Sequence, residues 1–222
     1  MYTKHRWQSE HYYNFNYIRY LPKDFDENKK YPLVFFLHGA GEWGDDLDQI
    51  TRWGYLQHVK DEGKEYPFIL IAPQSPRNHY WGCYTESLLA FLEEMCSELP
   101  VDRDRIYLTG ASMGGTGTWM LAMAAPHIFA AIMPVCGTGI YWFGESIIHM
   151  PIYAVHGDLD DIVPVQESIN MVGAVNRCGG DAKLQILEGV GHDAWNYAYA
   201  SDELLDWLLS QRRVKDNNVR EF

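Results

Sequence analysis

The sequence lacks long apolar runs and has few cysteines. No apolar run approaches the roughly 20 residues that a membrane-spanning helix needs, so none is expected. The four cysteines are widely separated and include no Cys-x-x-Cys pair, which argues against a zinc site and against a redox motif. We therefore expect free thiols in a reducing compartment and no bound metal.

Basic residues are also scarce. Only 18 Lys and Arg stand against 30 Asp and Glu, and the formal net charge is -12. Nucleic-acid binding needs a concentrated basic face, and an anionic membrane surface repels a chain of this charge. Residues 1–7 have no apolar stretch typical of a secretory signal. We expect a cytoplasmic protein without nucleic-acid or membrane partners, and the sequence leaves its oligomeric state open.

Short apolar runs alternate with helical patterns along the chain. The runs that predict buried strands are 33–37, 68–71, 130–133, 152–155 and 183–187. Alternating aromatic and asparagine residues at 13–17 predict a strand with one buried face. Apolar spacing, caps and breakers predict helices at 87–99, 165–178 and 202–210. This order predicts an α/β fold with a mostly parallel sheet, as a single domain over 1–222 with a polar C-terminal extension at 211–222.

One serine lies between two glycines in Gly110-Ala111-Ser112-Met113-Gly114, after a strand-like run at 106–109 and before a helix-like run at 118–125. A sharp strand-to-helix turn presents its central side chain at the apex, and bulky neighbours would clash there. The helix N-terminus behind it supplies positive potential. This context predicts that Ser112 is the nucleophile of a serine hydrolase. The alternative is a serine that only caps the following helix.

A serine hydroxyl needs a base, usually a histidine that a carboxylate orients. His192 follows the last expected strand, next to a glycine and near the chain end, which suits the base in the order Ser, Asp, His. An earlier loop offers Asp158, Asp160 and Asp161, and their spacing does not choose among them. Only one of the three can orient the histidine. The other two are expected to make turn or helix-capping hydrogen bonds, which is the ordinary role of loop aspartates.

Acyl transfer also needs donors for the oxyanion, typically two backbone N–H groups. The Met113 N–H, at the start of the helix after the nucleophile, is one candidate. The Ala40 N–H, in the glycine-rich loop after the strand at 33–37, is the other, unless that loop is an ordinary tight turn. Four tryptophans expected near strand ends are weaker candidates for substrate contact, although each is singly more often a packing residue: Trp43, Trp81, Trp142 and Trp195.

These motifs resemble those of the α/β-hydrolase esterases related to polyhydroxybutyrate depolymerase and of the phospholipase/carboxylesterase group. Some of these relatives are labelled predicted peptidases. The resemblance covers nearly the whole chain and rests on segments in the expected order: 20–42, 72–74, 102–115, 156–164 and 191–195. It implies an α/β-hydrolase fold.

The resemblance also assigns roles to individual residues. It implies that Ser112 is the nucleophile, Asp160 the orienting acid and His192 the base, with Ala40 and Met113 as the oxyanion amides. This chemistry requires no cofactor and no metal.

Two features depart from the family pattern: Trp43, where relatives often carry arginine, and the short aromatic connection 137–144. Because only residues 137–150 separate two predicted strands, no sizeable lid domain fits there. We expect a serine carboxylic-ester hydrolase acting on a small-molecule ester, short-chain or aryl- or sugar-linked. The alternatives are a serine peptidase or an acyl thioesterase with the same triad, and a non-catalytic binding protein on a hydrolase scaffold.

Overall fold

An eight-stranded sheet forms the centre of the protein, for which a computed structural model describes residues 2–213. The strand order is β1-β2-β4-β3-β5-β6-β7-β8, antiparallel from β1 to β4 and parallel from β4 to β8. The strands are β1 (Tyr2–Arg6), β2 (Asn16–Tyr20), β3 (Tyr31–Leu37), β4 (Ile69–Pro73), β5 (Val101–Ala111), β6 (Ala131–Val135), β7 (Ile152–Gly157) and β8 (Ala182–Leu187).

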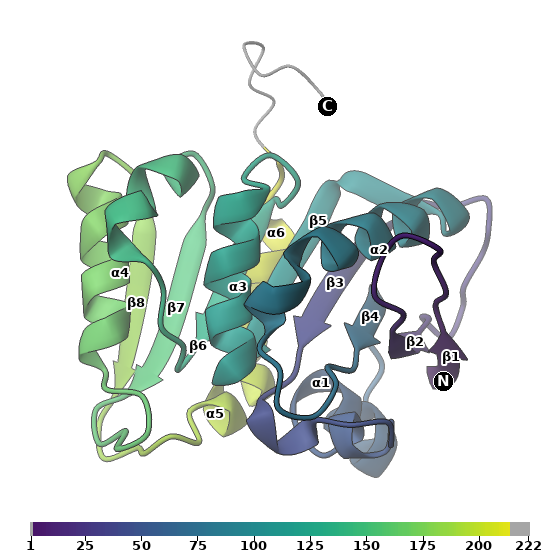
Figure 1. The fold of residues 1–222 in the computed structure, drawn as a ribbon, viewed down its shortest axis with the longest axis horizontal. Coiled ribbons are helices and arrows are strands. Elements are labelled where there is room, and N and C mark those ends of the chain that lie inside the picture. Colours follow the sequence, from purple (N-terminus) through teal and green to yellow (C-terminus); the bar gives the residue numbers. More distant parts are fainter. Residues whose placement is uncertain (1, 214–222) are drawn as a thin grey trace.

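Helices connect most of these strands (Figure 1). The α-helices are α1 (Gly54–Gln57), α2 (Thr85–Glu98), α3 (Met113–Ala124), α4 (Gln166–Arg177), α5 (Trp195–Ala200) and α6 (Asp202–Ser210). The 3₁₀ helices are η1 (Ala40–Glu42), η2 (Gln49–Thr51), η4 (Trp81–Tyr84) and η5 (Tyr141–Ile147), and η3 (His58–Glu62) is π-helical. Between β6 and β7 the chain forms only η5, so no lid domain enters there.

The predicted α/β class and mostly parallel sheet are confirmed, but the strand expected at 13–17 is partly wrong. β2 begins only at Asn16, and residues 13–15 precede it without regular secondary structure. The Ser9 N–H donates to Asn14 Oδ1, and the Tyr13 N–H donates to Ser87 Oγ on α2. Phe15 and Tyr17 are both buried, and the Phe15 carbonyl accepts the Trp7 N–H at 2.7 Å, so the alternation marks the segment that leads into the paired strand. Of the expected C-terminal extension, 214–222 lie outside the described residues.

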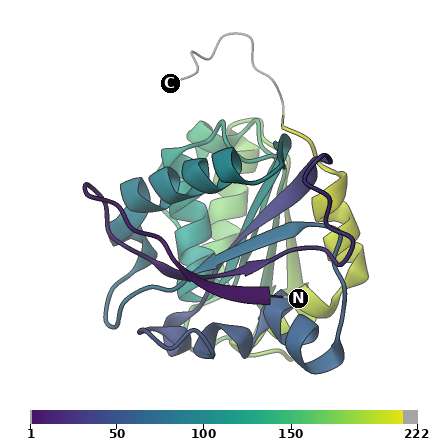
Figure 2. The same cartoon turned by 90° about the vertical axis from the view of Figure 1, so that its right-hand side faces the viewer.

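Alternate residues of the central strands face two different cores. In β3, Leu33, Phe35 and Leu37 pack in one core together with residues of α2, α3 and α4. Val34 and Phe36 pack in the other, together with residues of α1, α5 and α6. Figure 2 shows the sheet between these two helical layers, with α6 on one side and α2 on the other. Burial on both faces explains why these strands read as continuous apolar runs.

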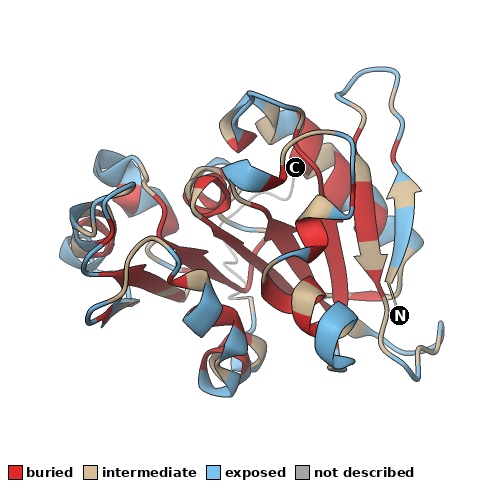
Figure 3. Ribbon diagram, turned by 90° about the horizontal axis from the view of Figure 1, so that it is seen from below, coloured by how far each residue is buried: buried red, intermediate tan, exposed pale blue. Residues whose placement is uncertain are grey.

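The carboxyl ends of the six parallel strands meet at one edge of the sheet, at the bottom of Figure 1. Figure 3 views the molecule from this side and shows buried central strands beside the partly exposed strand β1. The loops after β3, β5, β7 and β8 all leave from this edge, so distant segments can meet there. Within residues 2–213, no helix has the length and apolar character needed to cross a bilayer.

The tight packing of the β5–α3 turn gives a stability prediction. A Cβ on Gly114 would overlap the carbonyl oxygen of Leu37, whereas one on Gly41 meets nothing within 4 Å. We expect Gly114→Ala to lower the free energy of unfolding by about 3 kcal/mol, because backbone atoms must shift to accept the methyl group. Urea unfolding followed by circular dichroism measures this, with Gly41→Ala as the control. Equal unfolding free energies for the two variants would contradict the steric argument.

Candidate active site

Ser112 occupies a strained backbone position between β5 and α3. Its φ of 56° and ψ of -117° lie outside the regions that non-glycine residues ordinarily adopt. The conformation is held from both sides, because the Ser112 N–H donates to the Val135 carbonyl at 2.9 Å and the Ser112 carbonyl accepts from the Thr116 N–H at 3.0 Å. Such a turn exposes the hydroxyl at the end of the strand, as expected for a nucleophile elbow.

Ser112 contacts His192, which lies 80 positions later in the chain, and His192 in turn contacts Asp160. His192 Nε2 lies 2.7 Å from Ser112 Oγ, and His192 Nδ1 lies 2.7 Å from Asp160 Oδ2. Of the three aspartates in the loop after β7, Asp160 is therefore the one in contact with the imidazole. Asp158 instead accepts the Gly189 N–H at 2.7 Å, which is an ordinary loop contact.

The Asp160 side chain is buried but well supplied with donors. Its Oδ1 accepts the backbone N–H groups of Ile162 at 3.0 Å and Val163 at 2.9 Å. Burial alone would raise the pKa of the Asp160 carboxyl, but hydrogen bonds from His192 and from these N–H groups outweigh it and lower the pKa. The ionised carboxylate accepts the His192 Nδ1 proton, which leaves Nε2 free to take the proton of the Ser112 hydroxyl.

Backbone donors lie beside the hydroxyl. Met113 and Ala40 begin α3 and η1, and the first N–H groups of a helix have no partner within that helix. The loop after β3 approaches the nucleophile closely, because a Cβ on Gly39 would lie 3.7 Å from Ser112 Cβ. Ala40 and Ser112 also line the same cavity. Met113 thus follows Ser112 directly and Ala40 lines the same cavity as Ser112, so both N–H groups remain candidate oxyanion donors.

A buried histidine holds the loop that carries Ala40. His38 Nε2 accepts the Ser75 N–H at 2.9 Å, so the proton lies on Nδ1, which donates to the Gly39 carbonyl at 2.6 Å. Burial lowers the pKa of His38 to about 4. The imidazole is therefore neutral at pH 7 and acts as a brace between the loops that follow β3 and β4.

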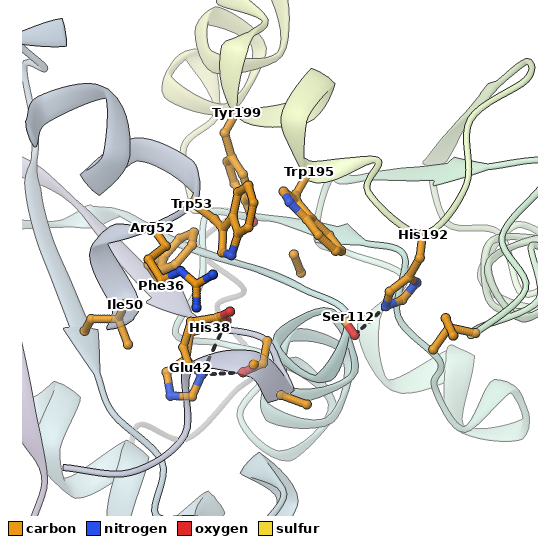
Figure 4. Close-up of a pocket in the computed structure, with 15 residues that line it drawn as sticks. Phe36, His38, Glu42, Ile50, Arg52, Trp53, Ser112, His192, Trp195 and Tyr199 are labelled. Atoms are coloured by element: carbon orange, nitrogen blue, oxygen red, sulfur yellow. Dashed lines mark hydrogen bonds and ion pairs between the residues drawn. The ribbon is translucent and has the colours of Figure 1, made fainter. Parts of the chain in front are cut away.

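A cavity of about 470 Å³ opens beside Ser112 (Figure 4). Its apolar wall consists mainly of these side chains: Phe36, Ile50, Trp53, Trp195 and Tyr199. The Trp195 ring lies 5.3 Å from the His192 ring and 6.1 Å from the Trp53 ring, measured between centroids. Glu42 and Arg52 lie across the cavity from His192, and burial raises the pKa of the Glu42 carboxyl.

Of the four predicted tryptophans, only Trp195 lines this cavity. Trp81 was predicted to contact substrate, but it is 1% exposed and donates its Nε1 proton to the His38 carbonyl. Trp43 was predicted to do the same, but its Nε1 proton points to Met113 Sδ at 2.9 Å. The acceptor of the Trp81 N–H is on the strand-end residue His38 and that of the Trp43 N–H is on α3, and neither indole lines the cavity.

For Trp142, contact with substrate stays a prediction. This residue is 70% exposed on η5 and does not line the cavity. Trp53, which sequence reasoning missed, does line it. Trp53 precedes α1, and no strand-end pattern marks it, so only the packing of α1 against α5 reveals its position.

Cys136, Asp160 and His192 are the one group of potential metal ligands among the described residues, with ligand atoms within 4.8 Å of one another. Burial raises the pKa of the Cys136 thiol, which donates to the His192 carbonyl at 3.3 Å. Asp160 and His192 already bind each other through Oδ2 and Nδ1. Each of the three side chains thus already has a hydrogen-bond partner, Cys136 the His192 backbone carbonyl and the other two each other.

Two family models match the chain. One, described as "Putative esterase", covers residues 13–142, and the other, described as "Phospholipase/Carboxylesterase", covers 84–201. A solved structure described as a thermostable esterase superposes with a TM-score of 0.84 and 30% sequence identity. That match covers 96% of this chain and 63% of the other.

Curated relatives carry several activities in their names. "Dipeptidyl-peptidase 5" of Porphyromonas gingivalis is 32% identical over 222 residues, which are 78% of this chain and 32% of that protein. "Probable feruloyl esterase C" of Aspergillus terreus is 28% identical over 162 residues, which are 70% of this chain and 58% of that protein. The chain thus spans less than two thirds of the length of either relative.

The buried His38 predicts a pH dependence of stability. The unfolded chain takes up the His38 proton near pH 6.5, but the folded protein does so only near pH 4. Stability is therefore complete above pH 6.5 and falls as the pH drops towards 4, by an amount on the order of 3 kcal/mol. Urea unfolding at a series of pH values measures the slope. His38→Gln, which cannot titrate, should flatten it, and an unchanged slope would count against a neutral His38.

Proposed function

Because the chain belongs to the esterase family of α/β-hydrolases, we propose that it hydrolyses carboxylic esters through an acyl-serine intermediate. The predicted family resemblance is thereby confirmed. The observation that carries the proposal is the hydrogen-bonded series Asp160–His192–Ser112, with 2.7 Å at each step, at the mouth of an apolar cavity. An oriented imidazole within reach of a serine hydroxyl is the arrangement that nucleophilic acyl transfer requires.

The reaction would begin with attack of Ser112 Oγ on the ester carbonyl carbon while His192 Nε2 takes the hydroxyl proton. The carbonyl oxygen becomes an oxyanion, and the N–H groups of Ala40 and Met113 stabilise it. Collapse of this intermediate breaks the bond to the alcohol, which leaves with the proton from His192. Water then attacks the acyl-serine by the same route and releases the acid. Asp160 stabilises the imidazolium in both halves.

The cavity supports an acyl group with an apolar, flat body. Its wall is mainly aromatic, and aromatic rings favour stacked or edge-on contact with a planar acyl group. The relative named as a feruloyl esterase is consistent with an aryl substrate. We propose short-chain and aryl esters as the substrate class, including esters of sugar hydroxyl groups.

A peptidase is the second candidate, because a relative with 32% identity is named as a dipeptidyl-peptidase. The same triad could cleave an amide, but the amine leaving group needs more effective protonation than an alcohol. A panel of matched ester, thioester and amide substrates separates these activities.

We also propose, from the sequence, that the protein is cytoplasmic. Cell fractionation of the native source tests this location.

The nucleophile assignment predicts the effect of removing one oxygen atom. We expect Ser112→Ala to lower kcat by about four decades or more, because no acyl-enzyme can form. Hydrolysis of p-nitrophenyl esters measures the rate, and labelling by a fluorophosphonate probe reports the nucleophile directly. Ser146→Ala, at an exposed serine outside the site, is the matched control. Activity that survives in the Ser112 variant would refute the assignment.

The cavity predicts selectivity between acyl groups. We expect Trp53→Ala to lower kcat/KM about tenfold for an ester with an aromatic acyl group, while hydrolysis of an acetyl ester changes little. Only the larger acyl group reaches this wall of the cavity. Trp142→Ala, which removes an exposed indole outside the cavity, should change neither rate. Rates for methyl cinnamate and p-nitrophenyl acetate give the comparison. A parallel loss on both esters after Trp53→Ala would contradict an acyl-binding role.

A further inference from the structure

A second imidazole contacts the carboxylate of Asp160. His156, at the end of β7, is completely buried, and its Nε2 lies 3.2 Å from Asp160 Oδ2. The same nitrogen lies 2.8 Å from the Val163 carbonyl oxygen. Oδ2 therefore has an imidazole nitrogen on each side, since His192 Nδ1 contacts it at 2.7 Å.

The partners of His156 determine which nitrogen carries its proton. A carbonyl oxygen can only accept, so Nε2 must carry the proton and donate it to Val163. Nδ1 then has a lone pair, which accepts the Ser168 hydroxyl proton at 2.7 Å. Ser168 lies on α4 and is 1% exposed, so water does not compete for this contact.

We propose that His156 is a positioning residue, whose Nε2–H binds the Val163 carbonyl and closes the turn that holds the Asp160 carboxylate. The argument rests on the proposed function, because it concerns the acid of the proposed triad. The Nε2–H binds the Val163 carbonyl, and the Val163 N–H returns to Asp160 Oδ1, while Asp160 Oδ2 lies 3.2 Å from the same His156 nitrogen. The carboxylate cannot rotate without losing one of these contacts.

The turn that His156 holds also affects how strongly Asp160 and His192 bind a proton. An Asp160 carboxylate that loses the Val163 N–H attracts a proton more strongly, either on itself or on the imidazole beside it. Loss of the His156 donor should therefore move the acid limb of the activity profile to higher pH. The titratable groups that face Asp160 within the described residues are His192, His156 and Cys136. Cys136 carries no charge there, since burial raises its pKa.

Two substitutions separate hydrogen bonding from packing. His156→Leu fills much of the space without a donor, whereas His156→Gln supplies an amide N–H in place of Nε2. We expect the Leu variant to lose about tenfold in kcat, with its acid limb at higher pH, and the Gln variant to stay close to the wild-type protein. His58→Leu is the matched control, because His58 is also buried but binds the Tyr66 hydroxyl instead.

A wild-type profile in the Leu variant would overturn the proposal, and so would equal losses in the Leu and Gln variants. Ser168→Ala keeps the ring but removes the contact that holds its tautomer, and it should move the acid limb in the same direction by less. If the Leu variant does not fold, the pH profile of the Ser168→Ala variant tests the proposal instead.

Proton NMR keeps this test independent of the proposed function. The low-field resonance of the His192 Nδ1 proton should shift in the Leu variant and persist in the Gln variant, and an unchanged resonance in the Leu variant would overturn the proposal. If the wild-type protein hydrolysed no ester, the proposed function would fail while this comparison still tested the role of His156.

Discussion

The closest backbone approach around the site lies where α3 begins beside the end of β3. Gly110 and Gly114 both face the Leu37 carbonyl oxygen, and neither position has room for a Cβ. This contact brings the β5–α3 turn against the loop that follows β3. As a result, one steric constraint places the Ser112 hydroxyl, the α3 N-terminus and the Ala40 amide in the same small space.

The electrostatics of the site depend on where protons are held by buried contacts. The Asp160 carboxylate accepts backbone N–H groups on Oδ1 and the His192 imidazole on Oδ2, so it is ionised although it is buried. His38 is kept neutral by burial and by a backbone donor at Nε2. Both groups have one orientation before any substrate arrives, and such preorganisation is what lowers the barrier in acyl transfer.

Much of the fold could be read from the chain because its central strands are buried on both faces. Runs such as 33–37 and 152–155 leave no polar face, and this pattern is specific to a covered parallel sheet. Strand β1 was missed because it lies at the edge, where exposed polar residues carry no such signal. The alternation at 13–17 placed the strand too early, since Phe15 is buried just before β2 begins and only Asn16 and Tyr17 lie within it.

The sequence by itself indicated Ser112 as the candidate nucleophile, because Gly-x-Ser-x-Gly between a strand and a helix favours a sharp turn that exposes the hydroxyl. It also indicated His192 through its place after the last strand. Residue spacing left three neighbouring aspartates open, and only the family resemblance pointed to Asp160, which the tertiary structure brings into contact with His192. The tertiary structure alone added Trp53 to the cavity wall and placed His156 against the acid. These outcomes depend on side-chain direction and on packing between elements far apart in the chain, which local spacing does not encode.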